Sequence, residues 1–161
     1  MNLPRFRLPD DRGGSGGTDD VFQEQDVVLA LLHGGCRRCA ALEAALGRAS
    51  QEVRALGAVA FAISPGHGAP APAAEPLRRL VDARGDVSAE IATRVGARPG
   101  EARLVVADRY GEVFAALPAH GLDGEGDRAG QAGQAETLVR EALDWLHFVQ
   151  VQCPECGAPS W

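Results

Sequence analysis

Two cysteines separated by two residues form the most chemically suggestive pattern in this sequence, Cys36-Arg37-Arg38-Cys39. An apolar run at residues 27–32 precedes them, and helical periodicity begins at Cys39. At such a junction both sulfurs can meet within the first helical turn and close a small disulfide ring. The helix N-terminus and the two arginines favour a thiolate over a thiol. The pattern predicts a redox-active dithiol; unreactive reduced cysteines and half of a zinc site are the alternatives.

The position of each cysteine predicts its role. Cys36 precedes the helix, where access and the amide field are best, so we expect it to be the nucleophile. Cys39 lies within the first turn and would resolve the mixed disulfide. His33, three residues upstream of Cys36, could assist proton transfer. The alternative, which we favour, is a loop histidine with no catalytic duty.

A second cysteine pair lies near the end of the sequence, in Cys153-Pro154-Glu155-Cys156-Gly157. This pattern looks like a zinc knuckle, in which glycine permits the tight turn around the sulfurs. A knuckle supplies two of the four ligands that zinc needs. Three interpretations stay open: a shuttle that exchanges disulfides with the first pair, one zinc ion held by all four thiolates within a chain or between subunits of a homodimer, and an inert tail.

Composition and charge narrow the class of protein. The 161 residues are 45% hydrophobic, which suits one globular domain with a substantial core. A formal net charge of −6 argues against nucleic acid or an anionic membrane as a partner. We recognise no secretory signal and no apolar run long enough to span a membrane, so a cytoplasmic location is expected. Cysteines there are mostly reduced, which favours catalysis or metal binding over a structural disulfide framework.

Hydrophobic periodicity divides the chain into three parts: an extended lead-in at 1–26 with a flexible glycine-rich turn, a domain at 27–150, and a cysteine-bearing tail at 151–161. The expected elements are strands at 27–32, 58–63 and 77–81, a hairpin of 104–107 with 112–117, and helices at 39–56, 87–95 and 136–150. Asp86 is expected to cap the second helix, and residues 121–133 to form a loop. This order predicts an α/β protein of thioredoxin-like fold, with a central mixed β-sheet flanked by helices.

Four segments between residues 3 and 117 follow one another in a distinctive order: LPRFRLPDDRGG, VVLALLHGGCRRCAALEAAL, RRLVDARGDVSAEIATRVGA and ARLVVADRYGEVFAAL. In this order they resemble the redoxin branch of the thioredoxin superfamily, the peroxiredoxin-like alkyl hydroperoxide reductase and thiol-specific antioxidant proteins. The resemblance places Arg103 where the peroxiredoxin arginine faces the reactive thiol; a solvated arginine at a strand end is the alternative. Peroxiredoxins carry a proline and a threonine upstream of their reactive cysteine. Leu29 and His33 stand at those positions here if Cys36 is aligned, and Leu32 and Cys36 stand there if Cys39 is aligned.

The resemblance implies a thiol–disulfide oxidoreductase or a thiol-dependent peroxide reductase, acting through Cys36 and Cys39 without an organic cofactor. Its partners would be a disulfide or hydroperoxide substrate and a reductant, either a thiol protein or a low-molecular-weight thiol. The alternative function is non-enzymatic: a thioredoxin scaffold that binds zinc or a protein partner through its two cysteine pairs.

Overall fold

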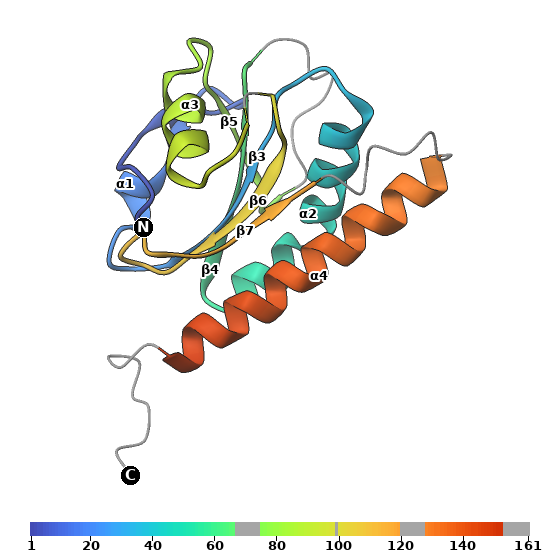
Figure 1. Cartoon of the computed structure of the whole chain (residues 1–161). Helices are drawn as coiled ribbons and strands as arrows, with labels where there is room; N and C mark the ends of the chain where they lie inside the picture. Colours follow the sequence, from blue (N-terminus) through green and yellow to red (C-terminus); the bar gives the residue numbers. More distant parts are fainter. Residues whose placement is uncertain (67–74, 99, 120–127, 153–161) are drawn as a thin grey trace.

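A mixed β-sheet lies between two layers of helices in the computed structural model of this chain (Figure 1). The structure describes residues 1–66, 75–98, 100–119 and 128–152. Five strands form the main sheet in the order β5-β4-β3-β6-β7. Their bounds are β3 Asp26–Leu31, β4 Ala58–Ser64, β5 Arg78–Val81, β6 Arg103–Ala107 and β7 Val113–Pro118. β3, β4 and β5 run parallel, whereas β6 and β7 are antiparallel to their neighbours. The predicted thioredoxin-like α/β architecture is confirmed.

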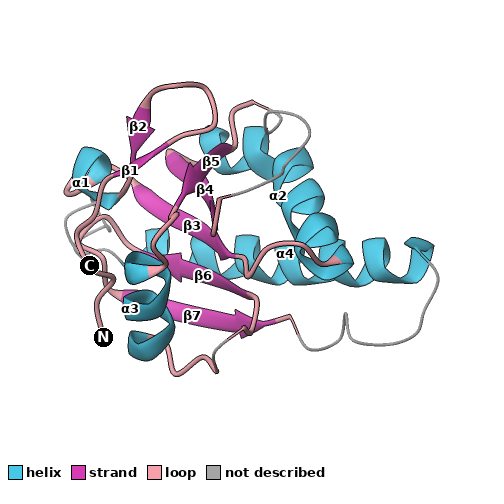
Figure 2. Ribbon diagram, turned by 90° about the horizontal axis from the view of Figure 1, so that it is seen from above, coloured by secondary structure: helices cyan, strands magenta, loops and turns pink. Residues whose placement is uncertain are grey.

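The central strand β3 is buried along its whole length because helices cover both faces of the sheet. Helices α2 (Arg37–Ala55) and α4 (Arg128–Gln152) lie on one face, and α3 (Asp86–Arg94) lies on the other (Figures 1 and 2). Successive strand residues point to opposite faces. Val28 and Ala30 therefore pack toward α2 and α4, whereas Leu29 packs toward α3. A continuous apolar run is what a strand buried on both faces requires.

The N-terminal segment is folded onto the domain, which corrects the prediction of an extended lead-in. Strands β1 (Leu8–Pro9) and β2 (Ser15–Gly16) form a small antiparallel sheet, and α1 (Thr18–Val21) follows. Leu3 and Phe6 are buried with α3 over the same face of the main sheet. Burial of these apolar side chains, together with the sheet residues that they cover, stabilises the folded segment despite its glycine-rich composition.

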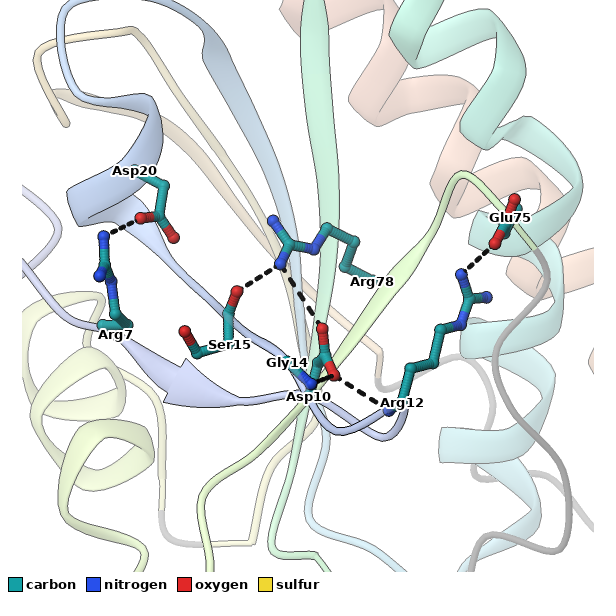
Figure 3. Close-up of polar contacts among 8 residues, drawn as sticks. All are labelled: Arg7, Asp10, Arg12, Gly14, Ser15, Asp20, Glu75 and Arg78. Atoms are coloured by element: carbon teal, nitrogen blue, oxygen red, sulfur yellow. Dashed lines mark hydrogen bonds and ion pairs between the residues drawn. The ribbon is translucent and has the colours of Figure 1, made fainter.

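A set of polar contacts joins this segment to β5 (Figure 3). Arg78 of β5 donates a hydrogen bond to the Ser15 carbonyl at 2.5 Å, and its guanidinium lies 3.6 Å from the Asp10 carboxylate. The backbone N–H groups of Gly14 and Arg12 donate to the same carboxylate. These N–H groups, Gly14 first, hold the pKa of Asp10 below its usual value.

The starts of α4 and α3 differ from the sequence-based expectation. Helix α4 begins at Arg128, so the glycine-containing stretch up to residue 133 is helical rather than part of a loop. Glycine in a helix costs about 1 kcal/mol per residue relative to alanine. The packing of α4 on α2 offsets this cost. Helix α3 is not capped by Asp86: its N-cap is Gly85, and the buried carboxylate of Asp82 accepts the first-turn N–H of Ser88 at 2.7 Å. Asp86 is the first residue of the helix itself.

No helix in the described ranges combines the length and apolar character needed to cross a membrane.

Candidate functional site

The dithiol lies immediately beyond the end of the central strand, in a turn that leads into α2. The buried Leu32 extends the strand by one hydrogen bond, donating its N–H to the Ile63 carbonyl at 2.9 Å. Gly34 and Gly35 follow with φ values of +77° and +67°, in the left-handed region that glycine tolerates best. A Cβ atom on Gly34 would lie 2.8 Å from Cγ of Pro65. The two consecutive glycines thus reverse the direction of the chain, with Gly34 close to the ring of Pro65.

The reversal brings His33 back against the first cysteine. Its Nε2 atom lies 3.4 Å from the sulfur of Cys36, and both side chains are half-buried. From the sequence, the favoured interpretation of His33 was a loop histidine with no catalytic duty. The signal that could have located it is the Gly34-Gly35 pair, since two flexible residues permit the tight reversal.

Cys36 is the N-cap residue of α2. Its backbone is extended, with φ −114° and ψ 153°, and its sulfur accepts a hydrogen bond from the N–H of Cys39 at 3.3 Å. An N-cap side chain normally satisfies one of the unpaired amides at the start of a helix in this way. The predicted arrangement of strand, thiol turn and helix is therefore what the structure contains, and α2 begins at Arg37 rather than at Cys39.

Cys39 occupies a different environment from Cys36, although both are free thiols. It is only 4% exposed and belongs to the core between α2, α4 and the sheet. Burial raises the pKa of the Cys39 thiol to about 11, and Cys36 contributes to the increase through a hydrogen bond and its charge. Cys39 is therefore held as the thiol while the half-exposed Cys36 is open to solvent.

The arginines are distributed unequally around the dithiol. Arg37 is exposed and Arg38 half-exposed, and both lie in the first turn of α2. Arg103 begins β6, directly opposite Leu31 at the end of the sheet that carries the thiol turn. Successive strand residues point to opposite faces of the sheet. Leu104 packs with Cys39 on the face covered by α2 and α4, so the neighbouring Arg103 belongs to the face covered by α3.

The guanidinium of Arg103 is engaged on that opposite face. It donates to the carbonyl oxygens of Val95, Gly96 and Ala116 at 3.2–3.3 Å and pairs with Glu101 at 3.1 Å. These contacts correct the expectation, taken from the peroxiredoxin resemblance, that Arg103 faces the reactive thiol. The alternative of a solvated arginine is also wrong, since its side chain is only 14% exposed.

The other predicted site residues, Cys153 and Cys156, lie outside the described residues, whose last range ends at Gln152. Their assignment as a zinc knuckle or a second redox pair stays a prediction.

Comparisons with known proteins find the same fold in several solved structures. No family model and no curated protein matches the sequence. Among solved structures, peroxidoxin BcpB from Mycobacterium tuberculosis is 18% identical, with a TM-score of 0.58 over 88% of this chain and 95% of that one. A putative thiol:disulfide interchange protein DsbE from Chlorobium tepidum is also 18% identical, with a TM-score of 0.61 over 90% and 95%. Thioredoxin peroxidase I from Plasmodium yoelii is 13% identical, with a TM-score of 0.61 over 96% and 95%.

At these identities the likeness establishes the fold. The chain has the thioredoxin-like fold shared by peroxiredoxins, thioredoxins and DsbE-like redoxins. The resemblance inferred from the four sequence segments is confirmed at that level, and a C-x-x-C dithiol lies at the start of the helix that follows the central strand.

Proposed function

We propose that this protein is a thiol–disulfide oxidoreductase in which Cys36 is the nucleophile and Cys39 the resolving thiol. One observation supports the proposal above the others. A half-exposed Cys36 caps α2 with its sulfur 3.3 Å from a helix amide, beside a buried Cys39. An accessible sulfur at a helix N-terminus next to a protected partner is the asymmetry that dithiol exchange requires.

The reaction transfers two electrons from the dithiol to a disulfide substrate. The Cys36 thiolate attacks one substrate sulfur, which forms a mixed disulfide and releases the other substrate sulfur as a thiolate. Cys39 then loses its proton and attacks the sulfur of Cys36, which releases the second substrate thiolate and leaves a Cys36–Cys39 disulfide. His33, with Nε2 at 3.4 Å from the Cys36 sulfur, is placed to exchange a proton with that atom. An external thiol, either a protein or a small molecule, reduces the disulfide again.

A disulfide is the substrate that the site favours over a hydroperoxide. Peroxide reduction needs donors that stabilise charge as the O–O bond breaks. The residue expected to supply them, Arg103, is bound to three backbone carbonyls and Glu101 on the opposite face of the sheet. Leu29 and His33 stand where the peroxiredoxin proline and threonine would be.

Insulin reduction and peroxide oxidation together test the proposal. We expect the chain with Cys153→Ser and Cys156→Ser to reduce insulin disulfides with dithiothreitol, and a further Cys36→Ser change to abolish turnover. Cys39→Ser in the same background should instead accumulate a mixed disulfide that mass spectrometry detects. Stopped-flow mixing with hydrogen peroxide should oxidise Cys36 no faster than an ordinary thiol. If the protein neither reduces insulin nor reacts rapidly with hydrogen peroxide, the result contradicts the proposal and favours the non-enzymatic alternative, a scaffold that binds zinc or a protein partner.

A further inference from the structure

Three potential metal ligands converge at the dithiol. A ring nitrogen of His33 and the sulfurs of Cys36 and Cys39 all lie within 4.8 Å of one another. Nε2 of His33 lies 3.4 Å from the sulfur of Cys36. The cysteines come from one helical turn and the histidine from the reversed turn before it, so the whole group is local in sequence.

This spacing suits a tetrahedral ion. Zinc binds sulfur at about 2.3 Å and a histidine nitrogen at about 2.0 Å. At a tetrahedral angle these bond lengths put the nitrogen and a sulfur about 3.5 Å apart, and two sulfurs about 3.8 Å apart. The observed 3.4 Å between His33 and Cys36 is close to the first value. All three separations are at most 4.8 Å, so the two pairs that include Cys39 need to approach by about 1.3 Å at most.

The donor types narrow the choice of metal. Two thiolates and an imidazole are soft or intermediate ligands, which favour zinc and Cu(I) over the hard cations Mg²⁺ and Ca²⁺. Three protein ligands leave the fourth tetrahedral position open, as in zinc sites that exchange a water or another ligand. His33 and Cys36 are half-exposed, so an ion can reach the group from solvent, while the buried Cys39 forms its inner wall.

We propose that His33, Cys36 and Cys39 form a zinc site in the reduced protein. Binding displaces the protons of the two thiols, and the imidazole binds as the neutral base. No atom changes its oxidation state. Both sulfurs are then occupied, so zinc and the Cys36–Cys39 disulfide exclude each other. Zinc would therefore suppress the proposed thiol exchange, and oxidation of the dithiol would release the metal. The binding step itself does not depend on the proposed function.

Zinc titration of the full chain tests the site. The Cys153→Ser, Cys156→Ser variant removes the second cysteine pair, so that any remaining high-affinity site is the one proposed. We expect one zinc ion per reduced chain, measured by competition with a chromophoric chelator. With Co²⁺ as a probe, we expect thiolate-to-cobalt charge-transfer absorption and tetrahedral ligand-field bands. Oxidation to the Cys36–Cys39 disulfide should abolish both signals.

Variants of the histidine decide whether it is a ligand. His33→Ala in this background should weaken zinc binding by more than about tenfold, because loss of even an outer-shell partner costs 10–100-fold. His33→Cys should restore tight binding, which separates ligand loss from a folding defect. His147→Ala is the matched control, since His147 is exposed on α4. Substoichiometric zinc in the parent, or equal affinity of the parent and the His33→Ala variant, would overturn the proposal.

The outcomes also separate this site from the proposed function. A chain that reduces insulin but binds no zinc would refute the zinc site alone. A chain that binds one zinc ion through His33 but turns over no disulfide would refute the oxidoreductase alone.

Discussion

Cys36 and Cys39 should react at very different rates with an alkylating reagent, although only two residues separate them. The reactive form is the thiolate, and burial together with the neighbouring Cys36 raises the pKa of Cys39 from an ordinary value of 9.0 to about 11. At pH 8 a thiol with the ordinary value is about 10% ionised, whereas one with a pKa of about 11 is about 0.1% ionised. The chemistry alone therefore predicts about a 100-fold lower rate for Cys39 than for an ordinary thiol.

Access acts in the same direction. Cys39 is 4% exposed, so iodoacetamide must wait for a local opening of the first turn of α2, while Cys36 is half-exposed. Timed alkylation of the reduced protein at pH 8, quenched and mapped by mass spectrometry, gives the rate at each cysteine. The Cys39 rate should still be rising at pH 10, as expected for a group that titrates near pH 11.

A Cys36→Ser variant separates the causes of the shift. Burial is the larger cause and persists in this variant, whereas the charge of Cys36 is removed. Cys39 should therefore react faster in the variant than in the wild type, yet more slowly than an ordinary thiol. Equal alkylation rates at Cys36 and Cys39 in the wild-type protein would refute the reasoning, because neither burial nor the raised pKa would then control reactivity.

Three further predictions concern stability. Gly34→Ala should destabilise the protein more than Gly35→Ala in urea unfolding: both introduce left-handed strain of about 1–2 kcal/mol, but only the first also meets Pro65 at 2.8 Å. Equal losses would contradict the close approach. Burial raises the pKa of Asp26, so the stability that this carboxyl contributes is present below its unfolded pKa and lost as the pH rises through its folded pKa. The free energy of unfolding of Asp26→Asn should therefore rise relative to that of the wild type as the pH increases from 3.8 towards neutrality, measured in urea titrations. A difference that does not change with pH would argue against this reasoning. Asp82→Ala should lower the free energy of unfolding by about 1–2 kcal/mol, because the Asp82 carboxylate accepts the N–H groups of the N-cap residue Gly85 and of Ser88 in the first turn of α3. Asp86→Ala should cost less, and thermal melts of the two variants compare them.

The elements that carry the dithiol were predictable because their signals are local. The apolar run at 27–32 became β3, Asp26–Leu31, since a strand buried on both faces needs unbroken hydrophobicity. The cysteine spacing at a strand–helix junction predicted that Cys36 precedes the helix, and it does, although the helix begins at Arg37 rather than at Cys39. The helix expected to end at residue 56 ends at Ala55, and the expected hairpin of 104–107 with 112–117 is formed by β6 and β7.

The N-terminal lead-in and the start of α4 could not be predicted in this way. Glycine-rich composition indicates a loop when only neighbouring residues are considered. In the folded chain, Leu3 and Phe6 cover a sheet face formed by residues up to a hundred positions away, and α4 extends along α2. The fold of the N-terminal segment and the start of α4 both depend on burial between segments that are distant in sequence. A local sequence pattern cannot predict such contacts.

The sequence by itself determined the order of strands and helices, the position of the dithiol at the start of a helix, and the kind of chemistry that two such thiols can perform. The tertiary structure decided which residues reach them. It turned Arg103 to the opposite face because strand residues alternate, and it folded His33 against Cys36 through two left-handed glycines. It also buried Cys39 but not Cys36. The difference between the two thiols arises from packing around α2, because desolvation depends on neighbours in space rather than in sequence.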